Sequence, residues 1–385
     1  PTMSDSTLVV WDEILTAYDH GPGHPLRPVR LDLTIALARS LGVLRRPGIT
    51  IAPPESASDD VLELVHDPDY VSFVKTAPDE LMSRLALRYG FGNGDNPVFD
   101  RMHETSAMVT GASVQAAAAV WSGGSQHAVN LSGGLHHAMR DRASGFCVYD
   151  DPAVAIAWLL GAGAQRVAYV DVDVHHGDGV QAAFYGDPRV LTVSLHESGE
   201  YLFPGTGAAS EVGSGDGRGT SVNVALPVGT DDASWLHAFA EIVPAVVRAH
   251  RPQILVTQLG CDTHALDPLA HLALSVDGQR AAYRLLHDLA HEFCDGRWLA
   301  VGGGGYEIVQ VVPRAWTHAI AEMAGTAVSG ATPDDWRELA FERSGELAPP
   351  DLSDGQQPSV GSQPAAVERA VDATRRAVFP LLGVA

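Results

Sequence analysis

The chain has 385 residues, 45% of them hydrophobic, so it can bury a large core. Its 25 basic and 47 acidic residues give a net charge of −22, which argues against nucleic-acid binding and favours a cationic partner such as a lysine-bearing protein. Charge alone does not separate that role from a contribution to solubility. No apolar run approaches the roughly 18 residues of a spanning helix, and no secretory or transit segment is evident, so we expect no membrane partner.

The chain ends and the cysteines indicate domain organisation and compartment. Pro1 and Thr2 precede Met3, so we expect the natural chain to start at Met3 and to form one domain over residues 3–385, with a C-terminal helical extension from about residue 331. The three cysteines are scattered and odd in number, which argues against a disulfide framework and a zinc ribbon and for a cytoplasmic location. They are Cys147, Cys261 and Cys294.

Strand-like apolar runs alternate with helical patterns along the chain, which predicts a parallel sheet with crossover helices. Residues rich in Pro, Ser, Gln and Gly predict a loop near the C-terminus, at 350–363. The predicted strands are 8–11, 128–131, 167–172, 190–195, 254–259 and 298–301. The predicted helices are 29–41, 103–121, 152–160, 235–249, 278–293 and 365–378.

A pair of adjacent histidines, His136 and His137, follows the predicted strand 128–131 in a glycine-rich loop. Such a loop can aim both imidazoles into a cleft. Taken alone, a surface loop with two separately hydrogen-bonded histidines explains the pair about as well.

The stretch VAYVDVDVHHGDG at 167–179 carries the most chemistry. Its apolar start is typical of a parallel strand covered on both faces, so the acids follow at the carboxyl end, where open α/β sheets place their sites. Because side chains alternate along an extended chain, Asp171, Asp173 and His175 would point the same way and could meet one cation. A surface loop of solvated acids would explain neither the strand nor its apolar flanks.

Two later strands also end in reactive groups. The sequence GCDTHALDP follows the strand 254–259, and in it Asp262 and Asp267 compete to complete a metal site. Four glycines and Tyr306 follow the strand 298–301, in a loop that lets a phenol approach a ligand closely. The same glycines could cradle a phosphate, although their spacing does not fit a dinucleotide site.

Six motifs, in the order GGLHHA, SGFCVYDD, DVDVHHGDG, FPGTG, LGCDTHALDP and GGGGY, resemble the zinc-dependent histone deacetylase superfamily. The similarity runs from GPGHPLRPVR near residue 21 to the helix after Tyr306. GNGDNPVFDRMHE at 92–104 and Leu135 look most like the bacterial acetoin utilization (AcuC) branch. The resemblance implies an arginase-like α/β fold, with a mainly parallel eight-stranded sheet and helices on both faces, and hydrolysis of an acetylated lysine amide.

The resemblance also implies a catalytic zinc, or iron in its place in the cell, bound by Asp173, His175 and Asp267 with one position left open. The metal would polarise the acetyl carbonyl and lower the pKa of bound water from about 15.7 toward ~7. His137 would act as general base and then as acid, with His136 as electrostatic support. The carboxylates of Asp171 and Asp178 would orient His136 and His137, and Tyr306 would donate to the oxyanion.

Further residues are implied by the resemblance alone. Taken singly, a phenylalanine is more often core than channel, and the rim acid Asp95 fits an ordinary turn. A nucleophilic Cys147 would leave the metal residues unused, so we expect it to line a pocket instead. The implied substrate channel consists of Asp95, Gly145, Phe146, Phe203 and Leu269, an internal pocket beneath the metal includes Arg30 and Cys147, and a structural potassium ion would lie near Asp171, Asp173, His175, Ser194 and Leu195.

These features predict a metal-dependent protein lysine deacetylase. A deacetylase of small acetylated amines or polyamines is the alternative enzyme on the same scaffold. A catalytically silent acetyl-lysine binder is a third possibility, but it would not need general acid and base groups. A two-metal hydrolase of the arginase type fits less well, because the sequence offers one clear ligand trio.

Overall fold

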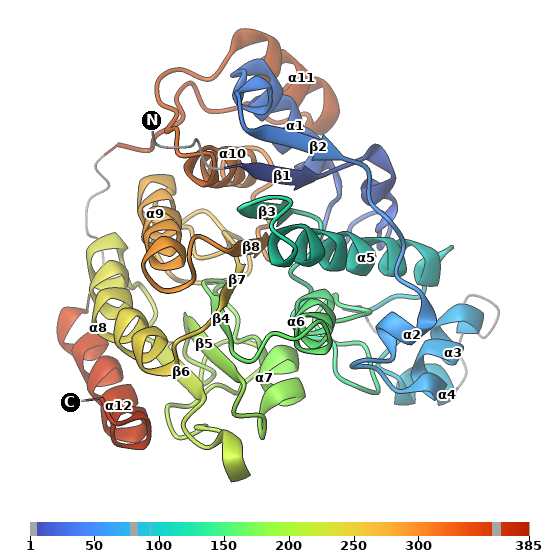
Figure 1. Ribbon diagram of the computed structural model, residues 1–385. Coiled ribbons are helices and arrows are strands. Elements are labelled where there is room, and N and C mark those ends of the chain that lie inside the picture. Colours follow the sequence, from blue (N-terminus) through green and yellow to red (C-terminus); the bar gives the residue numbers. More distant parts are fainter. Residues whose placement is uncertain (1–5, 78–83, 93, 356–362, 385) are drawn as a thin grey trace.

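The computed structural model describes residues 6–77, 84–92, 94–355 and 363–384. Eight strands form its central sheet: β1 (Thr7–Val10), β2 (Ile49–Ala52), β3 (His127–Asn130), β4 (Val167–Asp171), β5 (Val190–Glu197), β6 (Ser221–Leu226), β7 (Ile254–Gln258) and β8 (Trp298–Val301). Their order is β2-β1-β3-β8-β7-β4-β5-β6 (Figure 1), and every neighbouring pair is parallel.

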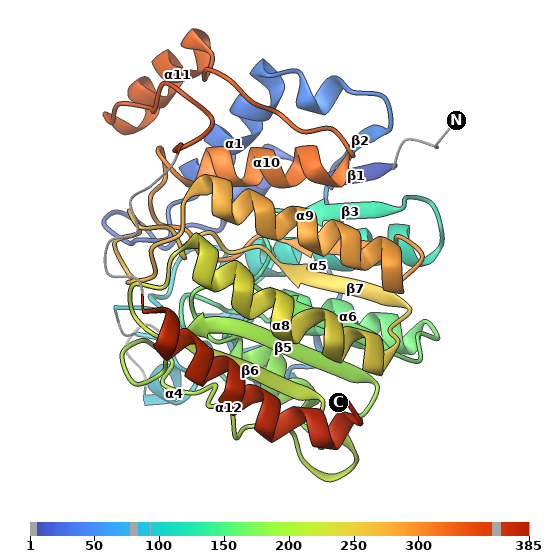
Figure 2. The same cartoon turned by 90° about the vertical axis from the view of Figure 1, so that its left-hand side faces the viewer.

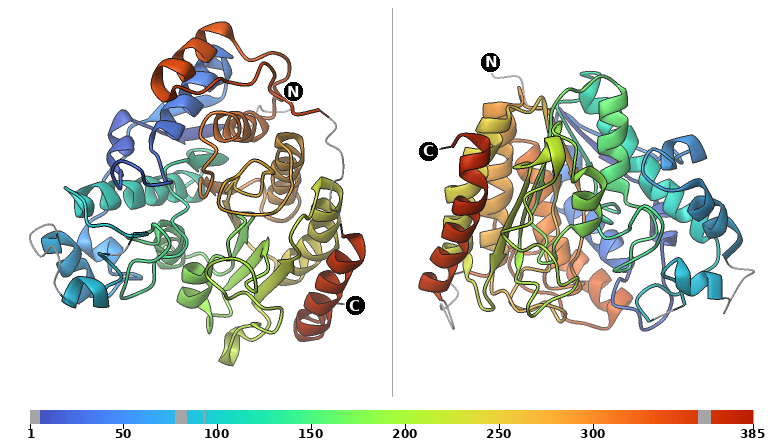
Figure 3. Two further views of the ribbon diagram at one scale, coloured as in Figure 1. Left: turned by 180° about the vertical axis from the view of Figure 1, so that it is seen from behind. Right: turned by 90° about the horizontal axis from the view of Figure 1, so that it is seen from below.

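Two layers of helices cover the sheet, one on each face (Figures 2 and 3), which confirms the predicted fold class. One layer consists of α1 (Val29–Ser40), α10 (Val312–Met323), α9 (Val276–Phe293), α8 (Asp232–His250) and α12 (Pro364–Leu382). The other consists of α5 (Met102–Trp121), α6 (Asp151–Gly161) and α7 (Asp178–Phe184). Outside the layers are α2 (Asp59–Leu62), α3 (Pro68–Thr76), α4 (Arg84–Arg88), α11 (Asp334–Ser344) and the 3₁₀ helices Glu13–Ala17, Val43–Arg45 and Gly215–Gly217.

All six predicted strands are present, and their ends differ from the prediction by at most two residues. The two strands that the sequence analysis missed, β2 and β6, form the edges of the sheet. Prolines flank the half-exposed β2, and Ser221 and Asn223 alternate with valines in β6. Neither strand therefore shows the continuous apolar run that marks a central parallel strand.

The six predicted helices are also present, and the last one continues beyond the prediction to Leu382. Among the helices that the analysis did not predict, α10 is fully buried between α1 and α9. Of the predicted loop 350–363, residues 350–355 form no helix or strand, and 356–362 lie outside the described part. In the regions that the structure describes, no helix has both the length and the apolar character needed to cross a membrane.

The C-terminal segment packs onto the rest of the fold. Helix α11 contacts α1, and α12 contacts both β6 and α8, so that α12 covers the edge strand. The Thr374 hydroxyl in α12 donates a 2.6 Å hydrogen bond to the carbonyl of Asn223 in β6. A single domain with an extension from about residue 331 stays a prediction.

A buried ion pair attaches the segment before α12 to the core. The guanidinium of Arg314 in α10 lies 2.7 Å from the Asp354 carboxylate, and the two side chains are 2% and 11% exposed. His264 and the backbone N–H of Val276 also donate to this carboxylate. Although burial alone would raise the pKa of Asp354, these hydrogen bonds and the charge of Arg314 hold it well below its usual range.

We expect Asp354→Asn to destabilise the protein by about 3 kcal/mol, because it leaves a buried guanidinium without its counter-charge. Since the folded pKa is depressed, the stabilisation by Asp354 is present above the unfolded value of about 3.9 and is lost as the pH falls through the folded pKa. Urea unfolding from pH 7 to 3 measures this. The difference between the two proteins should stay constant down to about pH 4 and should start to shrink below it.

Asp372→Asn is the matched control, because the Asp372 carboxylate is exposed and lies 4.0 Å from Arg376 in a surface pair within α12. Such a pair contributes about 0.5 kcal/mol or less. Equal effects of the two substitutions would contradict the role given to Asp354.

Candidate functional site

The reactive motifs meet because of the strand order. The four strands that precede them, β3, β8, β7 and β4, are scattered between residues 127 and 301 but lie side by side in the sheet. All are parallel, so their carboxyl ends share one edge. The loops that follow these strands therefore converge on one site, as in other open α/β sheets.

A compact cluster of Asp173, His175 and Asp262 lies at the centre of this edge. One ligand atom from each of the three lies within 4.8 Å of the others. The His175 Nδ1 is 3.1 Å from an oxygen of Asp173 and 3.0 Å from an oxygen of Asp262. All three side chains are buried. Two carboxylates and an imidazole in this arrangement can hold a metal ion.

The expected third ligand, Asp267, is not part of this cluster. Its two oxygens accept hydrogen bonds from the backbone N–H groups of Leu269 and Tyr306, both at 2.9 Å. Asp262, the competing acid of the same motif, thus lies in the compact cluster, and the role of Asp267 as a metal ligand stays a prediction. Asp262 accepts a hydrogen bond from the N–H of Val174, which follows β4, whereas Asp267 lies further along the loop and holds the backbone of Leu269 and Tyr306.

The electrostatics of the cluster favour a cation. Burial and the charge of Asp173 raise the pKa of Asp262 to about 8. Burial would lower the pKa of His175, but hydrogen bonds with Asp173 and Asp262 and their charges outweigh it and raise this pKa to about 10. Both shifts express the cost of holding two carboxylates together in a buried place.

The four glycines after β8 pack against the acids. The N–H of Gly304 donates to Asp173 at 2.7 Å. A Cβ on Gly304 would lie 1.9 Å from an oxygen of Asp262, so a larger residue would displace that carboxylate. Because the loop lies against carboxylates and donates to one of them, it does not suit a phosphate, and that alternative is excluded.

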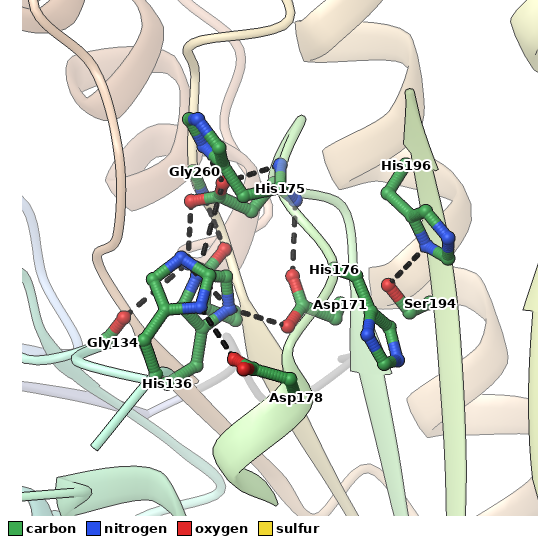
Figure 4. Close-up of polar contacts among 12 residues, drawn as sticks. Gly134, His136, Asp171, His175, His176, Asp178, Ser194, His196 and Gly260 are labelled. Atoms are coloured by element: carbon green, nitrogen blue, oxygen red, sulfur yellow. Dashed lines mark hydrogen bonds and ion pairs between the residues drawn. The ribbon is translucent and has the colours of Figure 1, made fainter. Parts of the chain in front are cut away.

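The histidine pair is oriented by two carboxylates (Figure 4). His136 Nδ1 lies 2.7 Å from Asp171, and His137 Nδ1 lies 2.7 Å from Asp178. The two Nε2 atoms are 3.1 Å apart. The predicted partner of each histidine therefore contacts it in the structure.

The environments of the two histidines separate their proton affinities. Burial would lower the pKa of His136, but the charges of Asp171 and Asp173 and the hydrogen bond to Asp171 outweigh it and raise this pKa to about 9. Burial and the nearby charge of His136 lower the pKa of His137 to about 4, in spite of Asp178. At neutral pH, His136 is thus charged and His137 is a neutral base.

A cavity of about 200 Å³ leads from the surface to these groups. The Phe203 ring stands edge to face on His137, and the Phe146 ring on Tyr306. A Cβ on Gly145 would lie 2.5 Å from the His137 ring and 2.8 Å from Phe203, so a glycine is needed there. The lining residues are Asp95, His137, Gly145, Phe146, His175, Leu202, Phe203, Leu269 and Tyr306, which include all five predicted channel residues.

The structure brings together only part of the predicted internal pocket and of the predicted potassium site. Arg30 donates to the Gly305 carbonyl at 2.9 Å and lines a small cavity of about 10 Å³, but Cys147 does not line that cavity. The Cys147 thiol instead donates to the Gly145 carbonyl, and burial raises its pKa well above the usual range, which does not suit a nucleophile. Asp171 and Ser194 are register neighbours on β4 and β5, and the potassium ion near them stays a prediction.

Sequence reasoning missed two residues that hold the site together. The Gln258 amide at the end of β7 donates to Asp173 at 2.6 Å, and its oxygen accepts from the N–H of Gly260. Asp151, at the start of α6, accepts from the N–H groups of Gly134 and Leu135 and so fixes the loop before the histidine pair. A polar residue ending an apolar strand was the only signal for Gln258, and the repeated acid in SGFCVYDD the only one for Asp151.

The N-terminal segment of Tyr18, His20 and the motif GPGHPLRPVR supplies a second set of supporting contacts that were missed. Tyr18 and His20 both contact the carbonyl of Phe146, at 2.6 and 3.0 Å. Phe146 has a φ of 70°, an unfavourable conformation for a residue with a side chain, and these bonds help to hold it. His24 contacts the carbonyl of Asp95 at 3.1 Å. The segment before α1 therefore positions two channel residues.

Comparisons with known proteins agree with this geometry. The histone deacetylase domain family matches residues 24–323. The chain is 43% identical over 335 residues to the acetoin utilization protein AcuC of Bacillus subtilis, covering 87% of this chain and 86% of that protein. It is 37% identical over 336 residues to AcuC of Staphylococcus xylosus, covering 87% of each.

Solved structures show the same fold. The crystal structure of an HDAC homolog from Aquifex aeolicus is similar with a TM-score of 0.85 and 29% identity, over 96% of this chain and all of that one. An HDAC homolog complexed with SAHA gives a TM-score of 0.84 at 29% identity, over 97% of this chain. Sequence similarity over most of the chain and a shared fold lead to one conclusion: the chain belongs to the histone deacetylase family.

Proposed function

We propose that this protein is a metal-dependent hydrolase that removes acetyl or short acyl groups from lysine side chains of proteins. One observation carries the proposal: the same cavity is lined by His175 of the two-carboxylate and one-imidazole cluster, by the carboxylate-oriented base His137 and by Tyr306. A silent binder would require only the cavity.

Asp173 and His175 would hold the metal together with Asp262, and Asp267, the ligand that the family resemblance implies, is the competing third ligand. Their donor set of oxygen and nitrogen atoms fits zinc, and it also fits iron(II). The raised pKa of Asp262 supports this role, because a bound cation would relieve the repulsion between the two carboxylates. When bound, the metal would polarise the substrate carbonyl and make water more acidic.

His137 is placed to move the protons. As a neutral imidazole with its Nδ1–H donated to Asp178, it can accept a proton from the attacking water at Nε2. It can then give this proton to the leaving amine. The charged His136, held by Asp171, keeps the pKa of His137 low and stabilises negative charge that develops nearby.

Tyr306 would stabilise the oxyanion. It lines the cavity, and its backbone N–H is held by Asp267 at 2.9 Å, which fixes the start of the side chain. Burial raises the pKa of the Tyr306 phenol well above its usual range, so the hydroxyl keeps its proton and can donate it as a hydrogen bond.

The channel suits an acyl-lysine. Phe146 and Phe203 offer aromatic faces to a four-carbon stem, and the exposed Asp95 lies at the mouth. The net charge of −22 supports a cationic substrate. An acetylated polyamine shares this charge complementarity, so small acetylated amines are the alternative substrates. Three buried, free cysteines are compatible with the cytoplasmic location, which stays a prediction.

The experiment that tests the function is a panel of acetylated lysine peptides and acetylated polyamines, each with and without chelator. We expect chelator-sensitive release of acetate from the peptides, because they fill both the channel and the rim. Turnover of polyamines alone would favour the small-amine alternative. Binding of peptides without any turnover at full metal occupancy would contradict a hydrolase.

The identity of the third ligand can be tested with two matched substitutions five residues apart. Asp262→Asn should lose the metal of this cluster, because it removes one of its two carboxylates. Asp267→Asn should keep the metal but lose turnover, because its new NH₂ group would face a backbone N–H of Leu269 or Tyr306. Elemental analysis of the purified proteins measures the metal. The opposite result would reassign the ligand.

For Tyr306→Phe, we expect about 100- to 1000-fold lower kcat with unchanged metal content and thermal stability, because only the oxyanion donor is removed. Single-turnover assays with an acetyl-lysine peptide measure the chemical step. Phe203→Leu, which alters the channel wall and keeps the donor, serves as the control. Normal turnover by metal-loaded Tyr306→Phe would refute the role of the phenol.

A further inference from the structure

Three histidines lie close together near the amino ends of the strands, opposite the candidate active site. His127 is the first residue of β3, and His287 and His291 lie near the end of α9. Figure 2 shows the start of β3 and the end of α9 on the same side of the molecule, away from the carboxyl ends of the strands. We propose that these residues form a second metal site, which binds zinc or a chemically similar divalent transition metal.

The geometry supports three nitrogen ligands. One ring nitrogen of each histidine lies within 4.8 Å of the others. His287 and His291 are four residues apart and so share one face of α9. The ring centroids are separated by 5.1 Å (His127 and His287), 5.2 Å (His127 and His291) and 4.5 Å (His287 and His291).

These spacings are close to those of a tetrahedral metal site. With metal to nitrogen distances of about 2.1 Å, tetrahedral ligand nitrogens lie about 3.4 Å apart. Each distance between two of the nitrogens therefore has to shorten by at most about 1.4 Å, which small side-chain rotations provide. His287 and His291 are on a surface-facing turn of α9, and His127 is buried beneath them.

The buried histidine is held in a suitable tautomer. His127 Nδ1 donates to the carbonyl of Met323, at the end of α10, at 2.6 Å. The lone pair then resides on Nε2, the form in which a neutral imidazole binds a metal. The fully buried Trp298 stands edge to face against His127 and His287 and limits their movement.

The donor set determines the class of ion. Three imidazoles suit zinc, nickel and copper, whereas magnesium and calcium require oxygen ligands. The carboxylate of Asp288 lies 3.8 Å from His287 and is on the exposed side. The site therefore differs from the cluster of two carboxylates and one imidazole, and the inference does not rest on the proposed function.

A bound ion would connect segments that are distant in the sequence. It would join the start of β3 to the end of α9 directly, and to the end of α10 through the Met323 carbonyl. Because a ligand that binds only the folded state stabilises it, zinc at this site should raise the thermal stability of the protein.

The test is zinc binding to untagged protein that has been stripped of metal, measured by competition with a chromophoric chelator. We expect two equivalents for the wild type and one for His291→Ala or His287→Ala, with deacetylase activity within about twofold of wild type. Mutation of a residue that hydrogen-bonds to a metal ligand typically lowers metal affinity by about 10- to 100-fold. Loss of a ligand itself should lower the zinc affinity of this site by more than that. These surface-side substitutions are preferred to one at His127, which is buried.

Two controls separate this inference from the proposed function. His237→Ala removes an exposed histidine paired with Glu368 on another surface and should leave both equivalents. Asp262→Asn should lose the zinc of the candidate active site and keep the zinc of the histidine site, so zinc should still raise its Tm. In the double variant Asp262→Asn/His291→Ala, zinc should no longer raise Tm. Zinc binding that is unchanged by His287→Ala and His291→Ala would overturn the second site, whatever Asp262→Asn does.

Discussion

The carboxylate of Asp173 is fully buried, and much of the site is arranged around its negative charge. It accepts hydrogen bonds from the Gln258 amide, the N–H of Gly304 and the N–H of His175. A buried carboxylate is tolerated only with such donors or a cation nearby. Asp262 brings a second negative charge to the same place, and this pairing of acids makes the cluster suitable for a metal.

The same constraint explains the glycines of the loop after β8. Backbone must approach both acids closely, because a side chain on Gly304 would occupy the position of the Asp262 carboxylate. The loop thus supplies an N–H donor at one end and holds Tyr306 at the other, where Asp267 accepts from the Tyr306 backbone. The glycine loop after β8 therefore both compensates the charge of Asp173 and positions the phenol of Tyr306.

The carboxyl ends and the amino ends of the strands carry different kinds of residue clusters. At the carboxyl edge, loops from four adjacent strands bring acids and histidines together, and their mutual effects separate the pKa values of His136 and His137 by about five units, from about 9 to about 4. The opposite edge, where strands begin and helices end, usually serves stability in such folds. The cluster of His127, His287 and His291 lies there, which is consistent with a stabilising ion and with no part in the chemistry.

Local patterns in the sequence predict most of the secondary structure and most of the chemical groups of the site. Continuous apolar runs identified the six inner strands, and short polar motifs at their ends pointed to Asp173, His175, the histidine pair and Tyr306. Such signals are local, because burial on both faces and the two-residue alternation of a strand are visible in a few residues. Edge strands lack the first of these signals and were missed.

The packing of distant segments places one of the two acids after β7, Asp262, in the compact cluster with Asp173 and His175. Asp262 and Asp267 lie in one short motif, and their residue type is the same, so no local pattern separates them. Their positions differ because the Asp262 carboxylate contacts His175, in the loop after β4, whereas the Asp267 carboxylate accepts from the backbone of Leu269 and Tyr306. The supporting roles of Gln258, Asp151 and Tyr18, and the meeting of His127 with two histidines of α9, likewise arise from contacts between distant segments, which the packing of the sheet and its helices creates.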